Sequence, residues 1–158
     1  MDAKLAKSPL DRQTDLANTH CEDKPANRKE YLSMVGSLMY AALRSRPDIA
    51  FSVIALSRYN VQPLEMHATA AKRVLQYLET TAEFRIHYRW LTSYPQSPHN
   101  SPSINIIGYT NSDWAGNLTT RKSVVGCVFG LGHTNANEEL VMSGLIHWQA
   151  KSQSVMAL

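Results

Sequence analysis

The hydrophobic residues of this chain change their spacing once, and that change constrains the fold more than any other feature. Between residues 28 and 81, apolar residues recur every three or four positions, which is typical of amphipathic helices. After residue 81 the interval becomes two, which is typical of half-buried strands. We therefore predict an α+β protein in which N-terminal helices are followed by a short antiparallel sheet.

Three helices are predicted from the helical interval. The apolar stripe of the first consists of Tyr31, Val35, Leu38, Met39 and Ala42. Pro47 suits the first turn of the second helix. The stripe of that helix consists of Ala50, Val53, Ile54 and Ser57. The third helix opens at Pro63, and its stripe consists of Leu64, Ala68, Ala71, Leu75 and Leu78.

Four strands are predicted from the interval of two: 84–90, 103–111, 123–132 and 144–152. The connections between the last three have lengths that suit antiparallel neighbours. The segment 132–144 is expected to form either a surface loop or a loop with a short helical turn at residues 140–142. Residues 154–158 resemble the start of a helix.

The chain divides into four parts on these grounds. Residues 1–27 are polar and lack periodicity, so we expect an extended or disordered lead-in. Residues 28–91 form the helical half and end in the first predicted strand. Residues 92–103 are rich in Ser and Pro and read as a linker. Residues 104–158 form the β half.

Composition excludes several classes of function. The chain has 158 residues and two cysteines, and its net charge of +3 permits a nucleic-acid partner without requiring one. No Cys or His residues stand at zinc-ligand spacing, and we expect no cofactor. The chain has no signal peptide and no run of about 20 apolar residues, so we expect an intracellular protein without a membrane segment.

The stretch GYTNSDWAG, residues 108–116, places Asn111 and Asp113 on one face of an extended chain. Two carboxylates at these positions would resemble half of a Mg²⁺ site, because Mg²⁺ prefers charged oxygen ligands. The Asn111 amide is neutral, so this pair offers a metal ion at most one charged ligand, Asp113. The alternative is an aspartate that initiates a turn.

The chain resembles a known family in five ordered blocks: YLSMVGSLMYAALRSRPDIAFSVIALSRYN (31–60), AAKRVLQYLETT (70–81), GYTNSDWAG (108–116), RKSVVGCVFGLG (121–132) and IHWQAKSQSVMAL (146–158). Together they resemble the Pol polyprotein of copia-type LTR retrotransposons, at the junction between the reverse transcriptase and its ribonuclease H domain. The resemblance implies that the helices are the tail of a reverse transcriptase, its thumb or connection region. It implies that the β half holds the first three strands of a truncated RNase H-like fold.

For intact relatives the resemblance implies RNA-directed DNA polymerase and ribonuclease H activities that depend on Mg²⁺. The first catalytic carboxylate of the family falls at Asn111, and the next family carboxylate would follow residue 158. The family's polymerase aspartates would precede residue 1. We therefore expect a degenerate polyprotein fragment without catalytic activity. The alternatives are a non-catalytic module that binds RNA–DNA hybrid and a residual metal-dependent ribonuclease H.

Two basic pairs are candidate phosphate contacts on a nucleic acid. Arg121 and Lys122 open the 123–132 strand, and Lys72 and Arg73 lie on the third predicted helix, away from its apolar stripe. A solvated surface is the alternative for each pair.

One face of the 123–132 strand is apolar and needs a cover, and it consists of Val125, Cys127, Phe129 and Leu131. The N-terminal helices could fold over it, the sheet edge could self-associate or bind another partner, or the protein could be marginally stable.

Overall fold

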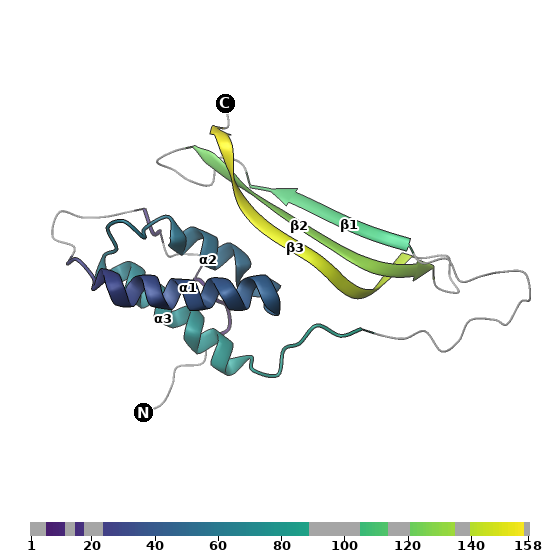
Figure 1. The fold of residues 1–158 in the computed structure, drawn as a ribbon, viewed down its shortest axis with the longest axis horizontal. Coiled ribbons are helices and arrows are strands. Elements are labelled where there is room, and N and C mark those ends of the chain that lie inside the picture. Colours follow the sequence, from purple (N-terminus) through teal and green to yellow (C-terminus); the bar gives the residue numbers. More distant parts are fainter. Residues whose placement is uncertain are drawn as a thin grey trace, which may run out of the picture.

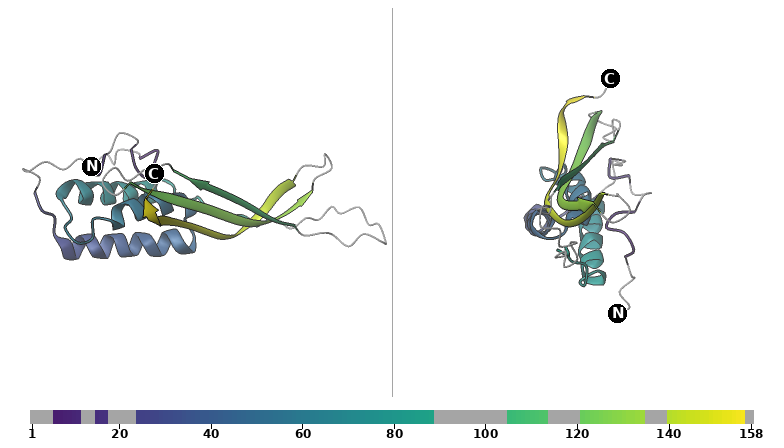
Figure 2. Two further views of the ribbon diagram at one scale, coloured as in Figure 1. Left: turned by 90° about the horizontal axis from the view of Figure 1, so that it is seen from above. Right: turned by 90° about the vertical axis from the view of Figure 1, so that its right-hand side faces the viewer.

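The structure is a computed structural model that describes residues 6–11, 15–17, 24–88, 105–113, 121–134 and 140–156. Helices come first and a three-stranded antiparallel sheet follows, which confirms the predicted α+β architecture (Figure 1). The helices cluster at one end of an elongated molecule, and the sheet runs alongside them and beyond them (Figure 2). None of the helices in the described parts of the chain has the length and apolar character needed to cross a membrane.

Helix α1 (Arg28–Arg44) begins at a polar cap and buries the predicted stripe. The Asn27 side chain accepts hydrogen bonds from the backbone N–H groups of Lys29 and Glu30, and its own amide donates to the Glu30 carboxylate. These bonds satisfy N–H groups that have no partner within the helix. The buried residues of α1 are Tyr31, Val35, Leu38 and Ala42.

Pro47 opens the second helical segment, as predicted. It starts a short 3-10 turn, η1 (Pro47–Ile49), which leads directly into α2 (Ala50–Ser57). The buried residues of α2 are Ser52, Val53 and Leu56. Its buried face therefore shares Val53 with the predicted stripe, while Leu56 takes the place expected for Ser57.

Helix α3 (Glu65–Thr80) buries a face that is shifted from the predicted one. Leu75 was expected in the stripe but is 43% exposed, whereas Val74 and Tyr77 are buried. The prediction considered only apolar residues and so omitted His67. The Nδ1 atom of His67 accepts from the Leu64 N–H at 3.0 Å, and its Nε2 lies 3.0 Å from the Leu16 carbonyl oxygen. Val74 follows His67 by seven positions, which is about two helical turns, so both residues lie on the same face of α3.

The core lies among the helices, and it includes part of the predicted lead-in. Ala6 and Leu16 are buried within the same cluster as the helical residues, and Pro25 forms an isolated bridge with Leu64. The described parts of residues 1–27 therefore contribute to the helical core. Tyr31 donates a buried hydrogen bond of 2.8 Å to the Leu56 carbonyl, which joins α1 to α2.

The sheet consists of β1 (Asn105–Ser112), β2 (Lys122–Thr134) and β3 (Leu140–Met156), with β2 in the centre. The strands predicted at 103–111, 123–132 and 144–152 are confirmed, and β2 and β3 extend beyond their predicted bounds. Residues 140–142 belong to β3, so the alternative of a helical turn there is wrong. The helix expected at 154–158 is also wrong over 154–156, because Met156 pairs with Lys122 and the ladder continues along β2.

The strand predicted at 84–90 does not form over its described part. Residues 84–88 lie outside any strand, although they follow the alternating pattern. Phe84 and Tyr88 are 60% and 64% exposed, so the alternation does not mark a half-buried ladder. An isolated extended segment needs a neighbouring strand to become part of a sheet, and none of the described strands pairs with this one. Residues 89–104 lie outside the described residues.

The sheet contacts the helices through β3. Within the sheet, large side chains lie over several glycines. Trp148 on β3 donates from its indole Nε1 to the Ala42 carbonyl of α1 at 2.6 Å, and α2 packs against β3. A Cβ built on Gly108 would lie 2.6 Å from the Phe129 ring. The apolar residues at 125, 127, 129 and 131 are half-buried. Of the alternatives left open for covering the sheet, the structure shows the helices packed against its edge strand β3.

Two glycine substitutions should have opposite effects on stability. Gly36 lies within α1, and a Cβ there would meet no atom within 4 Å. Gly36→Ala should raise the free energy of unfolding by about 0.5–1 kcal/mol, because alanine loses less backbone entropy in a helix. A Cβ on Gly130 would lie 2.5 Å from the Gly144 carbonyl oxygen.

Gly130→Ala should therefore lower the free energy of unfolding by roughly 1–3 kcal/mol through overpacking. Urea unfolding followed by circular dichroism measures both changes. Equal effects of the two substitutions would contradict the packing described for Gly130.

Candidate functional site

Asn111 and Asp113 lie at one end of the sheet, and both engage neighbouring backbone. Asn111 pairs with Gly126 in the β1–β2 ladder, and its exposed side chain accepts from the Ser112 N–H at 2.9 Å. Asp113 follows β1, and its Oδ1 accepts from the Val124 N–H at 2.5 Å. The Asp113 N–H donates in turn to the Val124 carbonyl at 3.1 Å. Asp113 thus extends the ladder by one pair and uses a carboxylate oxygen to do so.

This pair of side chains does not fit a Mg²⁺ site. Mg²⁺ requires hard oxygen ligands in octahedral geometry and usually takes charged carboxylates. Asn111 supplies no charge, and one oxygen of Asp113 is already bonded to backbone. Within the described residues, no group of three His, Cys, Asp or Glu side chains is placed to hold a metal ion.

Arg121 and Lys122 lie at the same end of the sheet as Asp113. Arg121 is exposed and has a positive φ of 53°, and Lys122 is the first residue of β2. Lys151 is opposite Val125 in the β2–β3 register and is also exposed, so it joins this end of the sheet. Sequence reasoning missed Lys151, because only the register of β3 on β2 places it there.

Lys72 and Arg73 lie elsewhere on the molecule. Both belong to α3, which packs against α1 and α2, and α2 lies between α3 and the sheet (Figure 1). Lys72 is exposed, whereas Arg73 is half-buried and its Nε has no hydrogen-bond partner among the described residues. The structure therefore does not bring the two predicted basic pairs together.

Arg46 is a buried cation that sequence reasoning did not single out. Its Nε and Nη2 donate to the Asp48 carboxylate at 3.0 and 2.7 Å, and its Nη1 donates to the Thr81 carbonyl at 3.1 Å. The guanidinium also lies 5.6 Å from the Tyr77 ring centroid and 5.9 Å from that of Phe84. It therefore joins the chain after α1 to the chain after α3. The sequence offers no signal that distinguishes Arg46 from the exposed Arg44.

Charge pairing shifts the ionisation of this cluster. Burial of Asp48 disfavours its charged form, but the hydrogen bonds that it accepts, with that from Arg46 foremost, outweigh burial and lower its pKa. The hydrogen bond with Asp48 raises the pKa of Arg46, against the opposing effect of burial. Both groups are thus held in their charged forms near neutral pH.

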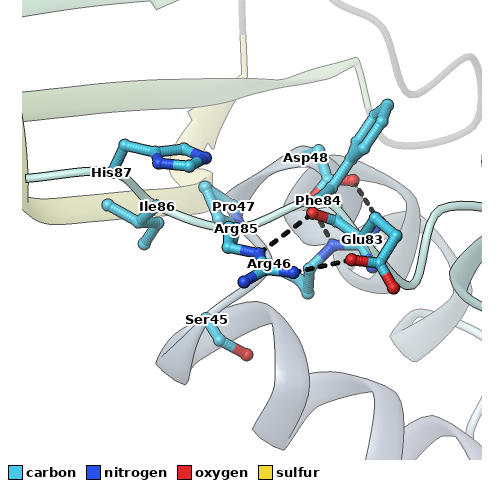
Figure 3. A pocket seen from close by; sticks show the side chains of 9 residues that line it. All are labelled: Ser45, Arg46, Pro47, Asp48, Glu83, Phe84, Arg85, Ile86 and His87. Atoms are coloured by element: carbon cyan, nitrogen blue, oxygen red, sulfur yellow. Dashed lines mark hydrogen bonds and ion pairs between the residues drawn. The ribbon is translucent and has the colours of Figure 1, made fainter.

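Two adjoining hollows surround the Arg46 cluster. The first, of about 420 Å³, is lined by residues 45–48 and 83–87, and Figure 3 shows these side chains with the bonds of Arg46 to Asp48 and of Arg85 to Glu83. The second, of about 490 Å³, shares Arg46, Phe84 and Arg85 with the first and extends to Trp148 on β3. We call this second hollow the arginine–aromatic groove, defined by Arg44, Arg46, Phe84, Arg85, Tyr88 and Trp148.

A third hollow, of about 290 Å³, separates the start of α2 from the sheet. Its lining includes Phe51 of α2, Asn111 of β1 and Cys127 of β2. Its lining contains no carboxylate, so Asn111 faces a neutral surface there.

The Arg46–Asp48 pair should make stability depend on pH in the acid range. The folded-state pKa of Asp48 lies below its ordinary value of 3.8, so its contribution is present above that value and is lost as pH falls through the folded-state pKa. Asp48→Asn should lower the free energy of unfolding by about 1 kcal/mol at pH 7, because the bonds are partly exposed.

The difference in the free energy of unfolding between the Asp48→Asn variant and the unaltered chain should shrink below pH 4. Glu83→Gln is the matched control, because the Glu83–Arg85 pair is largely exposed and should contribute little. Urea titrations at pH 7 and at a pH below 4 measure these differences. A loss of the same size at both would contradict a role for the Asp48 charge.

Comparison with known proteins gives relatives along most of the chain. It is 33% identical over 162 aligned residues to the retrovirus-related Pol polyprotein from transposon TNT 1-94 of Nicotiana tabacum, which covers 99% of this chain and 11% of that protein. It is 35% identical over 104 residues to the Pol polyprotein from transposon RE1 of Arabidopsis thaliana, which covers 66% of this chain and 6% of that protein. No protein-family model matches the chain, and no solved structure matches it.

Another relative is not named as a polyprotein, and the alignment covers most of both chains. The chain is 32% identical over 128 residues to the secreted RxLR effector protein 161 of Plasmopara viticola, which covers 81% of this chain and 76% of that protein. The chain therefore spans most of one curated relative but only a small part of the polyproteins. Because the polyprotein relatives align along most of its length, the chain belongs to the Pol polyprotein family of copia-type retrotransposons.

Proposed function

We propose that this chain is a catalytically inactive portion of a retrotransposon Pol polyprotein, from the junction between the reverse transcriptase and the ribonuclease H domain. The order of helices followed by three antiparallel strands supports this placement. The alignment of the polyprotein relatives along most of the chain supports it as well.

The observation that carries the proposal is the donor set at the end of β1. Asn111 occupies the position at which the family resemblance expects a catalytic carboxylate. One carboxylate oxygen of Asp113, two residues later, already accepts a hydrogen bond from the Val124 N–H. A two-metal mechanism needs concentrated negative charge to hold two cations together, and this pair supplies one charge that is already engaged.

Hybrid cleavage should therefore be absent. The purified chain and its Asn111→Asp variant, incubated with an RNA–DNA hybrid labelled on the RNA strand, should give no more product with Mg²⁺ or Mn²⁺ than with EDTA. Restoring one carboxylate leaves Asp113 in its bond to Val124, so the variant should stay inactive. Circular dichroism checks that both proteins are folded.

Mg²⁺-dependent cleavage of the RNA strand by either protein would refute the inactive assignment. Cleavage that increased in Asn111→Asp would instead identify a residual ribonuclease H.

A second candidate function is nucleic-acid binding without catalysis. It is favoured by the three cations Arg121, Lys122 and Lys151 at one end of the sheet, together with the net charge of +3. Cations of this kind contact phosphate oxygens and release counterions, which makes binding depend on salt concentration.

Salt dependence tests this function and compares the two basic pairs. Arg121→Gln with Lys122→Gln should reduce the slope of log affinity against log salt for an RNA–DNA hybrid by roughly 2, or about 0.9 for each lost contact. Lys72→Gln with Arg73→Gln removes the same charge from α3 and should leave the slope nearly unchanged. Equal changes from both double variants would show that only net charge matters.

A further inference from the structure

The arginine–aromatic groove has a lining that the proposed function does not use. Three arginines and three aromatic residues meet there, and its lining contains no carboxylate. Its residues come from the end of α1, the 82–88 segment and β3, which lie far apart in the sequence. The groove is thus a product of the fold.

The cations of the groove differ in how free they are. Arg46 is buried, and its charge is balanced by the ion pair with Asp48, so it shapes the groove without offering a free cation. Arg85 pairs with Glu83, but both side chains are largely exposed, so a stronger anion can displace the carboxylate. Arg44 is exposed and lies 5.7 Å from the Tyr40 ring centroid, and no carboxylate pairs with it among the described residues.

The aromatic rings are exposed and held in place. Tyr88 is 64% exposed, yet its hydroxyl donates to the Leu145 carbonyl at 2.6 Å and its ring lies against Gly144. Phe84 is 60% exposed and lies close to the Arg46 guanidinium. Exposed rings that are already ordered lose little entropy when another flat group stacks on them.

We propose that this groove binds an unpaired, single-stranded segment of nucleic acid, with bases stacked on Phe84 and Tyr88 and phosphates on Arg44 and Arg85. The proposal rests on the second candidate function and assigns it a site that the sequence did not suggest. Positive grooves with exposed aromatic rings bind single strands in this way, because every base offers a flat face for stacking. Paired bases cannot stack on the rings, so a duplex would contact the phosphate sites alone.

An acidic peptide is the competing ligand class. It would satisfy the arginines but would leave the exposed faces of Phe84 and Tyr88 without a stacking partner. The rings therefore favour nucleic acid, and substitution of a ring separates the two classes.

The test measures fluorescence anisotropy of labelled oligothymidylate and of a labelled RNA–DNA hybrid with the full chain. Phe84→Leu should weaken oligothymidylate binding about tenfold, through the loss of one stacked base, and should leave hybrid binding unchanged. Arg44→Gln should reduce the salt slope for oligothymidylate by about 0.7.

Matched controls remove an exposed ring and an exposed cation outside the groove. Phe51→Leu on α2 and Lys29→Gln at the start of α1 should leave oligothymidylate binding as it is in the unaltered chain. Thermal unfolding by circular dichroism checks each variant. If Phe84→Leu does not fold, the Arg44→Gln slope decides the question.

The outcomes separate the groove from the wider function. Oligothymidylate binding that Phe84→Leu and Arg44→Gln leave unchanged would overturn the groove, and hybrid binding that still depends on Arg121 and Lys122 would preserve the second candidate function. Competition by polyglutamate as strong as by unlabelled oligothymidylate would also overturn the groove. Failure of the chain to bind either probe would reject both.

Discussion

The end of α1 is the point on which the rest of the structure depends. The last carbonyls of a helix have no partner within it and must find one elsewhere. Here the Ala41 carbonyl accepts from the N–H groups of Ser45 and Arg46, and the Ala42 carbonyl accepts from the Trp148 indole of β3. One helix terminus therefore fixes both the turn into η1 and the position of the sheet. Arg46 then reaches from this turn to Thr81 and fixes the end of α3 as well.

The sheet is stabilised in part by its own side chains. Among the described residues, β3 is the strand that packs extensively against a helix, and that helix is α2. Elsewhere large side chains lie over glycines on neighbouring strands, as Phe129 does over Gly108 and Met142 over Gly130. A glycine opposite a bulky residue leaves room for that side chain to lie flat on the sheet, which buries apolar surface without a second layer. Of the apolar face predicted at 125–131, Phe129 is covered in this way.

The sequence predicted element type and order well because the interval between apolar residues is a local property. Tyr31, Val35 and Leu38 were placed correctly on the buried face of α1. The face of α3 was misplaced because it is anchored by His67, a polar residue whose two ring nitrogens have backbone partners. The strand expected at 84–90 does not form over 84–88, because a strand needs a neighbouring strand to pair with, and alternation of apolar residues does not show whether one is present. Contacts between distant segments, such as Arg46 with Thr81, leave no periodic trace at all.

The sequence indicated that Asn111 and Asp113 lie where a strand ends, and only the structure shows what their side chains contact. Alternation along β1 places Asn111 and Asp113 on one face, as the sequence indicates. Two carboxylates so placed would repel each other unless a cation lay between them. An amide at position 111 removes that repulsion and leaves Asp113 free to accept from the Val124 N–H. With Asn111 as the neutral neighbour, the end of the β1–β2 ladder carries the single charge of Asp113, which the Val124 N–H stabilises.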